Sequence, residues 1–120
     1  MSNTRDFGGK VVLITGSARN LGRAVAEALA QAGAAVVINS RSSKQEMEAT
    51  AAAIKAAGGR AIAHLADITD ANAVKRMVQA AVDTFGKLDI LINNAVVHDV
   101  KPFQELSFDD WRNRPRWSRW

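Results

Sequence analysis

The feature that most constrains the fold is a regular alternation between short apolar runs and longer stretches with helical periodicity. The predicted strands are residues 10–15, 35–39, 60–65 and 88–93. The apolar faces of the predicted helices run over residues 21–32, 47–54 and 74–85. Continuous runs rich in β-branched residues are typical of strands buried on both faces of a parallel sheet. Since one helix separates each pair of strands, we expect right-handed crossovers and an α/β sheet.

Local signals define where the helices begin and end. Gly33 and Gly58-Gly59 are expected to end the first two helices, and Gly86 the third. Asp70 is a suitable N-cap for the third helix. The first two helices should cover one face of the sheet and the third helix the other. Strand 88–93 then becomes an apolar edge, so we expect marginal stability or self-association through that edge.

A glycine-containing turn joins the first strand to the first helix. Gly16 allows the chain to turn sharply, and Gly22 allows the helix to pack closely on the sheet. The helix N-terminus then presents backbone N–H groups and partial positive charge, which suit a pyrophosphate. Ligands of such sheets bind beyond the carboxyl ends of the strands, where the strand order reverses. A tight turn without a ligand is the alternative for this segment taken alone.

Four motifs in the expected order resemble the short-chain dehydrogenase/reductase family. They are Thr15-Gly16 with Gly22, Asp67-Ile68, Asn93-Asn94-Ala95, and Phe108-Asp109-Asp110-Trp111, within residues 6–112. The resemblance implies a Rossmann-like, doubly wound parallel sheet that is truncated after its fourth strand. Two positions depart from the family pattern, because Asn20 and Val96 stand where glycine is usual. Asparagine tolerates positive φ better than most residues, so we expect the turn to form.

The resemblance implies a dinucleotide site, and charge favours NADP over NAD. The predicted cofactor-binding residues are Gly16, Ser17, Arg19, Asn20, Leu21, Gly22, Arg41, Asp67, Ile68, Asn94 and Ala95. An acid at the end of the second strand would bind the ribose hydroxyls of NAD, but residues 39–42 contain none. Arg41 and Arg19 could instead pair with a 2′-phosphate. The alternatives are solvated arginines at both positions and, for Asp67, an N-cap of the third helix.

The implied reaction is hydride transfer between a nicotinamide and a carbonyl or alcohol, as in a 3-oxoacyl-carrier-protein reductase. In the family, a tyrosine donates the proton, with a lysine and a serine beside it. The 120 residues contain no tyrosine, so we predict no catalytic residues and no activity for this chain alone. A small-molecule substrate is expected in a full-length relative. The alternative is a non-catalytic module that binds a dinucleotide.

The chain carries a net charge of +4, and its location argues against a basic protein. Residues 1–111 contain 12 basic and 12 acidic residues, whereas residues 112–120 contain four arginines and no acid. We therefore divide the chain into a partial dinucleotide-binding domain, 1–111, and an atypical, disordered tail, 112–120. A shift of reading frame near residue 112 is our hypothesis for the tail. A contact between the tail and nucleic acid or an anionic membrane is a less favoured alternative.

Composition excludes several other classes of protein. Without cysteine, disulfides and zinc–thiolate sites are excluded, and His64 and His98 lack partners at metal-ligand spacing, so we predict no metal site. No apolar run is long enough to span a bilayer. The N-terminus has no apolar signal-like core. We therefore expect a cytoplasmic protein.

Overall fold

Strands and helices alternate strictly along the part of the chain that this computed structural model describes, residues 6–94. Their bounds are β1 (Val11–Ile14), α1 (Asn20–Gln31), β2 (Ala35–Ser40), α2 (Lys44–Ala56), β3 (Arg60–Leu65), α3 (Ala71–Phe85) and β4 (Ile90–Ile92). The predicted helix start at 107–111 and the predicted tail lie outside the described residues. Within residues 6–94, no helix combines the length and the apolar character needed to cross a membrane.

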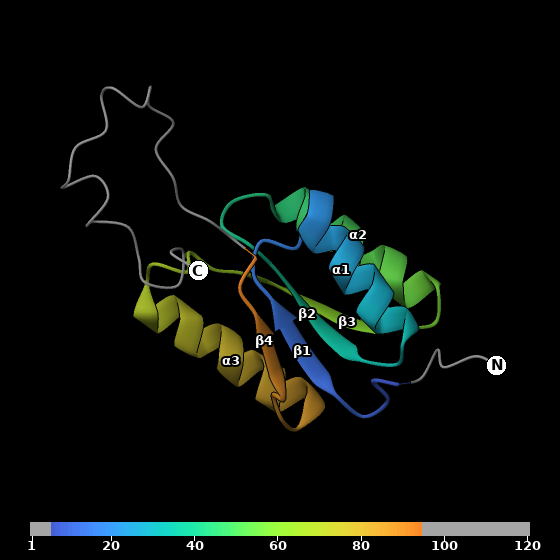
Figure 1. Ribbon diagram of the computed structural model, residues 1–120. Helices are drawn as coiled ribbons and strands as arrows, with labels where there is room; N and C mark the ends of the chain where they lie inside the picture. Colours follow the sequence, from blue (N-terminus) through green and yellow to red (C-terminus); the bar gives the residue numbers. More distant parts are fainter. Residues whose placement is uncertain (1–5, 95–120) are drawn as a thin grey trace, which may run out of the picture.

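The four strands form one parallel sheet in the order β3-β2-β1-β4. The chain first moves outward from β1 through β2 to β3, and then returns to place β4 on the other side of β1 (Figure 1). The direction of winding therefore changes between β1 and β4. This arrangement confirms the predicted Rossmann-like parallel sheet.

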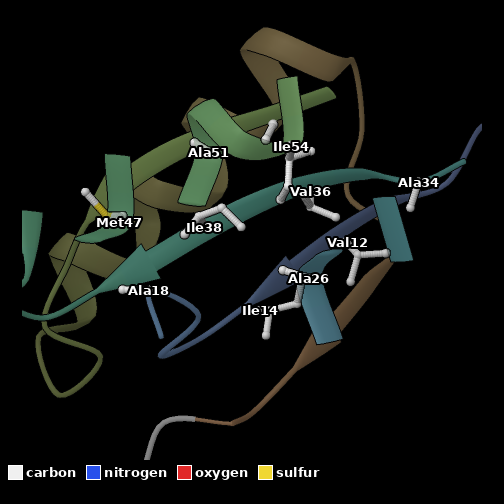
Figure 2. Close-up of a cluster of buried hydrophobic side chains, with 11 residues drawn as sticks. Val12, Ile14, Ala18, Ala26, Ala34, Val36, Ile38, Met47, Ala51 and Ile54 are labelled. Atoms are coloured by element: carbon white, nitrogen blue, oxygen red, sulfur yellow. The ribbon is translucent and has the colours of Figure 1, made fainter. Parts of the chain in front are cut away.

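The two faces of the sheet carry separate apolar cores. Helices α1 and α2 cover one face and α3 covers the other, as predicted (Figure 1). Val12, Ile14, Val36 and Ile38 belong to the core beneath α1 and α2 (Figure 2). Their strand neighbours, such as Leu13, belong to the core beneath α3. Strands β1 and β2 are thus buried on both faces, which explains why their sequences are continuously apolar.

The helix ends follow the predicted signals. Asp70 accepts hydrogen bonds from the backbone N–H groups of Asn72 and Ala73, which makes it the N-cap of α3. Gly86 adopts the left-handed conformation, with φ of 86°, and ends that helix. The alternative prediction, that Asp67 caps α3, is wrong because Asp70 occupies that position.

The apolar stripe of α3 differs in detail from its prediction. Ala73, Met77 and Ala81 are the buried residues of α3, whereas Val82 is 37% exposed. Helix α3 is the only described helix on its face of the sheet, so no neighbouring helix among residues 6–94 covers its flank. Only the central line of the stripe is buried as a result.

Strand β4 is shorter than the predicted 88–93, since it spans only Ile90–Ile92. Asp89 precedes the strand, and its carboxylate accepts the N–H of Val11 at 2.8 Å. Leu91 is 56% exposed on this edge of the sheet. Beside it, a cavity of about 290 Å³ opens between β4, β1 and α3, lined largely by apolar side chains. Self-association through this edge remains a prediction.

Candidate functional site

A cleft of about 630 Å³ lies at the carboxyl ends of β1, β2 and β3. Its walls come from the glycine turn, the residues after β2 and the residues after β3. Nine of the eleven residues that were predicted to bind a dinucleotide line it: Gly16, Arg19, Asn20, Leu21, Gly22, Arg41, Asp67, Ile68 and Asn94. Of the other two, Ser17 is buried and Ala95 lies outside the described residues. The fold thus brings together side chains from four distant segments.

The glycine turn has the backbone conformation that its sequence predicts. Gly16 has φ of 63°, which lets the chain leave β1 sharply. Asn20 has φ of 57° and is the only non-glycine residue among 6–94 with a positive φ. It occupies the position where the family has glycine, and asparagine tolerates this region. The predicted compensation for the missing glycine is therefore confirmed.

The N-terminus of α1 opens into the cleft. Arg19 is its N-cap residue, and the Arg19 side chain makes no capping hydrogen bond with the first turn. The first-turn N–H groups of a helix have no partner within the helix itself. Together with the helix dipole, they form a suitable place for an anionic group of a ligand.

Gly22 is required by a close approach between α1 and the turn. A Cβ atom at this position would lie 2.6 Å from Nδ2 of Asn94 and 2.9 Å from Cα of Ser17, and it would also overlap the Gly16 carbonyl oxygen. Two of these three atoms belong to the backbone, so they cannot move aside cheaply. Any side chain here would push α1 away from the turn.

Two arginines line the cleft, Arg41 after β2 and Arg19 in the glycine turn, and each lies beside an acid. Nε of Arg41 lies 3.4 Å from a carboxylate oxygen of Asp67. Nη1 of Arg19 lies 3.5 Å from Oε1 of Glu46. Both arginine side chains are largely exposed, at 71% and 64%. Exposed ion pairs of this kind are weak, so either guanidinium can turn to another anion at little cost.

Asp67 is held as a carboxylate at the mouth of the cleft. The Thr69 hydroxyl donates to it at 2.7 Å, and the Thr69 backbone N–H donates at 2.9 Å. These hydrogen bonds, together with the weaker attraction of Arg41, lower the pKa of Asp67 below its usual value. The carboxylate therefore remains ionised and fixed at neutral pH.

Asn94 connects the end of β4 to the glycine turn. Its side-chain amide donates to the Gly16 carbonyl at 3.0 Å, and its backbone N–H donates to Oγ1 of Thr15 at 3.0 Å. The preceding residue, Asn93, lines the apolar cavity on the other face instead. Asn94 thus both lines the cleft and holds the turn in place.

Ser17 does not line the cleft. It is completely buried, and its hydroxyl donates to the Ile14 carbonyl at 2.7 Å while it accepts the Asn39 N–H at 2.9 Å. The Ser17 backbone N–H donates to the Asn39 carbonyl at 2.8 Å. These bonds engage its polar groups within the protein, so the structure places Ser17 as a support of the turn.

Asn39 is a member of the site that was not among the predicted site residues. Asn39 is 1% exposed and borders the cleft, where its side chain bonds to the glycine turn. The available signal was an amide at the end of a run that is otherwise apolar, 35–38. Among the described residues, no group of three metal-ligating side chains is present. His64 lies in β3, away from the cleft lining.

Comparisons with known proteins agree on one family. The family model for short chain dehydrogenases matches residues 10–114. An uncharacterized oxidoreductase from Methylorubrum extorquens is 45% identical over 104 residues, which are 87% of this chain and 42% of that protein. A hydroxynaphthalene reductase-like protein from Metarhizium majus is 38% identical over 107 residues, 89% of this chain and 40% of that protein.

Solved structures show the same similarity. A short-chain dehydrogenase from Burkholderia cenocepacia in complex with NADP is 41% identical, with a TM-score of 0.78, over 87% of this chain and 42% of that one. A dehydrogenase/reductase from Sinorhizobium meliloti is 36% identical, with a TM-score of 0.79, over 88% of this chain and 42% of that chain. The chain thus spans less than half the length of these relatives.

Proposed function

Because the chain belongs to the short-chain dehydrogenase family, we propose that its cleft binds the adenosine and pyrophosphate portions of NADP. In a full-length relative, this binding would serve hydride transfer between the nicotinamide and a carbonyl or alcohol. A 3-oxoacyl-carrier-protein reductase is one candidate within this class of oxidoreductases. Residues 1–111 are the part of the chain that we assign to cofactor binding.

The observation that carries the choice of NADP is the charge at the adenosine end of the cleft. Arg41 follows β2 directly, and Arg19 stands across the cleft in the glycine turn. Residues 39–42 contain no acid that could bind both ribose hydroxyls of NAD. Guanidinium groups bind phosphate through paired, charge-assisted hydrogen bonds, so a 2′-phosphate is the better ligand here. A structural relative was solved with NADP bound, which is consistent with this assignment.

The remaining cofactor contacts follow from the shape of the cleft. We assign the pyrophosphate to the glycine turn and the N-terminus of α1, where backbone N–H groups are available. We assign the adenine to the Asp67–Ile68 segment, which lines the opposite wall. Asn94 would lie toward the nicotinamide end, and Ala95, outside the described residues, stays a predicted cofactor contact. When bound, the cofactor would supply the hydride, and these residues would hold and orient the cofactor.

Hydride transfer by the 120 residues alone is not expected. They include no tyrosine, which is the proton donor in this family. The substrate-binding portion would also belong to the further length that the relatives have. A non-catalytic module that binds a dinucleotide is therefore the second candidate function. It is favoured by the fact that the cleft is formed within residues 6–94.

Equilibrium titration with NADPH and NADH tests the proposal. We expect saturable quenching or enhancement of NADPH fluorescence, with NADPH bound at least tenfold more tightly than NADH at low salt. Raising the salt concentration should weaken NADPH more than NADH, since the extra contact is electrostatic. Tighter binding of NADH would contradict the assignment to NADP. Oxidation of NADPH by the 120-residue chain in the presence of a ketone would contradict the proposed lack of activity.

A further inference from the structure

Asn39 lies between the two loops that form the ends of the cleft. Its side-chain oxygen accepts the backbone N–H of Gly16 at 3.1 Å. Its side-chain nitrogen donates to the carbonyl oxygens of His64 and Ala66, both at 3.2 Å. Gly16 begins the glycine turn, whereas Ala66 immediately precedes Asp67. One side chain therefore bonds to both walls of the cleft.

Backbone contacts reinforce the position of this side chain. The N–H of Asn39 donates to Oγ of Ser17, and its carbonyl accepts the N–H of Ser17 at 2.8 Å. Asn39 also lies on β2, which pairs with β1 on one side and β3 on the other. The residue is 1% exposed, so water cannot replace any of these partners. The amide has little freedom to move independently of the two loops.

The pattern of donors and acceptors suits an amide and no other side chain of this size. Aspartate could still accept from Gly16, but its carboxylate would face the carbonyl oxygens of His64 and Ala66. Leucine would leave the Gly16 N–H and both carbonyls without this partner. Buried polar groups that lose their partners are strongly destabilising. Displacement of one loop is thus opposed by bonds to the other loop, through a single rigid group.

We propose that Asn39 is a positioning residue that couples the pyrophosphate-binding turn to the adenosine-binding segment. This inference rests on the proposed function, since it assumes that these two loops bind the two portions of NADP. Asn39 acts through Gly16 and Ala66 and does not itself need to touch the cofactor. Ordering of one loop by a ligand should therefore reduce the local opening of the other loop.

Amide hydrogen exchange, followed by NMR, tests this coupling in the unmodified chain. Adenosine is the probe, because it offers groups to the Asp67–Ile68 segment but has neither a 2′-phosphate for Arg19 nor a pyrophosphate for the turn. At saturation we expect exchange of the Gly16 amide to slow about tenfold. In Asn39→Asp, measured at its own saturating probe concentration, the slowing at Gly16 should disappear. A direct contact between probe and turn would persist in this variant, whereas a coupling through Asn39 would not.

The control is Ile54→Ala, which removes a buried side chain of α2 that does not line the cleft. This variant should be less stable but should retain the slowing at Gly16. The inference would be overturned if the saturating probe left the exchange rate of the Gly16 amide unchanged in the unmodified chain. This measurement is the deciding test if Asn39→Asp does not fold. Equal slowing in Asn39→Asp would also overturn it. If the unmodified chain binds neither this probe nor NADP, the proposed function itself is wrong.

Discussion

Replacement of Arg41 by alanine should weaken NADPH selectively. Arg41 stands at the end of β2 with its guanidinium 71% exposed, and Asp67 is its partner at 3.4 Å. A hydrogen-bonded contact to a charged group contributes about 1.5–3 kcal/mol, which corresponds to roughly 10- to 150-fold in affinity. Arg41 must leave Asp67 to make that contact. An exposed ion pair is worth at most about fivefold, so after this deduction we expect Arg41→Ala to weaken NADPH binding by roughly 2- to 30-fold.

The assay is fluorescence titration of NADPH and NADH at two salt concentrations. NADH has no 2′-phosphate, so its affinity for Arg41→Ala should change by less than about threefold, since the variant mainly removes an exposed charge. The salt dependence of NADPH binding should also become shallower. Arg23→Ala is the matched control, because Arg23 is an arginine of α1 that bonds to Glu27 and does not line the cleft.

Two outcomes would refute this reasoning. If Arg41→Ala weakened NADPH and NADH equally, the arginine would support the loop and would not read the 2′-phosphate. If Arg23→Ala weakened NADPH as much as Arg41→Ala, the effect would come from overall charge. In either case the assignment of Arg41 to the phosphate would be abandoned.

Four further predictions follow from single contacts. Gly22→Ala should lower the free energy of unfolding by up to about 2 kcal/mol, because overpacking against Gly16, Ser17 and Asn94 costs about 1–3 kcal/mol and the gain in helix propensity offsets about 1 kcal/mol. A raised urea midpoint would contradict the close approach. Asn20→Ala should be about 1 kcal/mol less stable than Asn20→Gly, because φ is positive there; equal urea midpoints would count against that strain. The backbone N–H of Val11, with a smaller effect of Lys87, lowers the pKa of Asp89 in the folded state. Ionised Asp89 therefore stabilises the folded state above the unfolded-state pKa, and this stabilisation is lost as the pH falls toward the lower folded-state pKa. Urea unfolding between pH 7 and 3 should accordingly show a flatter pH dependence for Asp89→Asn, and an identical slope would be evidence against this role. Leu91→Lys should reduce self-association in sedimentation velocity, provided that the unmodified chain associates; a monomeric unmodified chain at all concentrations would contradict the edge-strand prediction.

The order and type of the elements could be predicted because buried positions require apolar residues, and these form recognisable patterns in the sequence. Strands β1 and β2 are covered on both faces, so every position in them except the last two of β2 is apolar. The end of α3 was equally clear, since Gly86 takes a conformation that favours glycine. Where an element is covered on one side only, the apolar pattern in its sequence predicts burial less well. Val82 of α3 and the ends of β4 were therefore misjudged.

The candidate site could be predicted at positions where the local backbone conformation restricts the residue type. Gly16 and Asn20 are examples, since positive φ restricts the choice of residue. The roles of Ser17 and Asn39 depend on pairings between strands, and periodicity does not record which polar groups meet. The pairing of Arg41 with Asp67 also joins loops that are far apart in the sequence. Such contacts require the three-dimensional arrangement.

The central claim is that the cleft at the carboxyl ends of the strands binds NADP. The most direct test is an amide NMR titration of the chain with NADP⁺. We predict saturable shifts at Gly16, Leu21, Arg41 and Asp67, with residues of α3 such as Val78 unaffected. Absence of saturable shifts, or shifts centred on the apolar cavity beside α3, would contradict the claim.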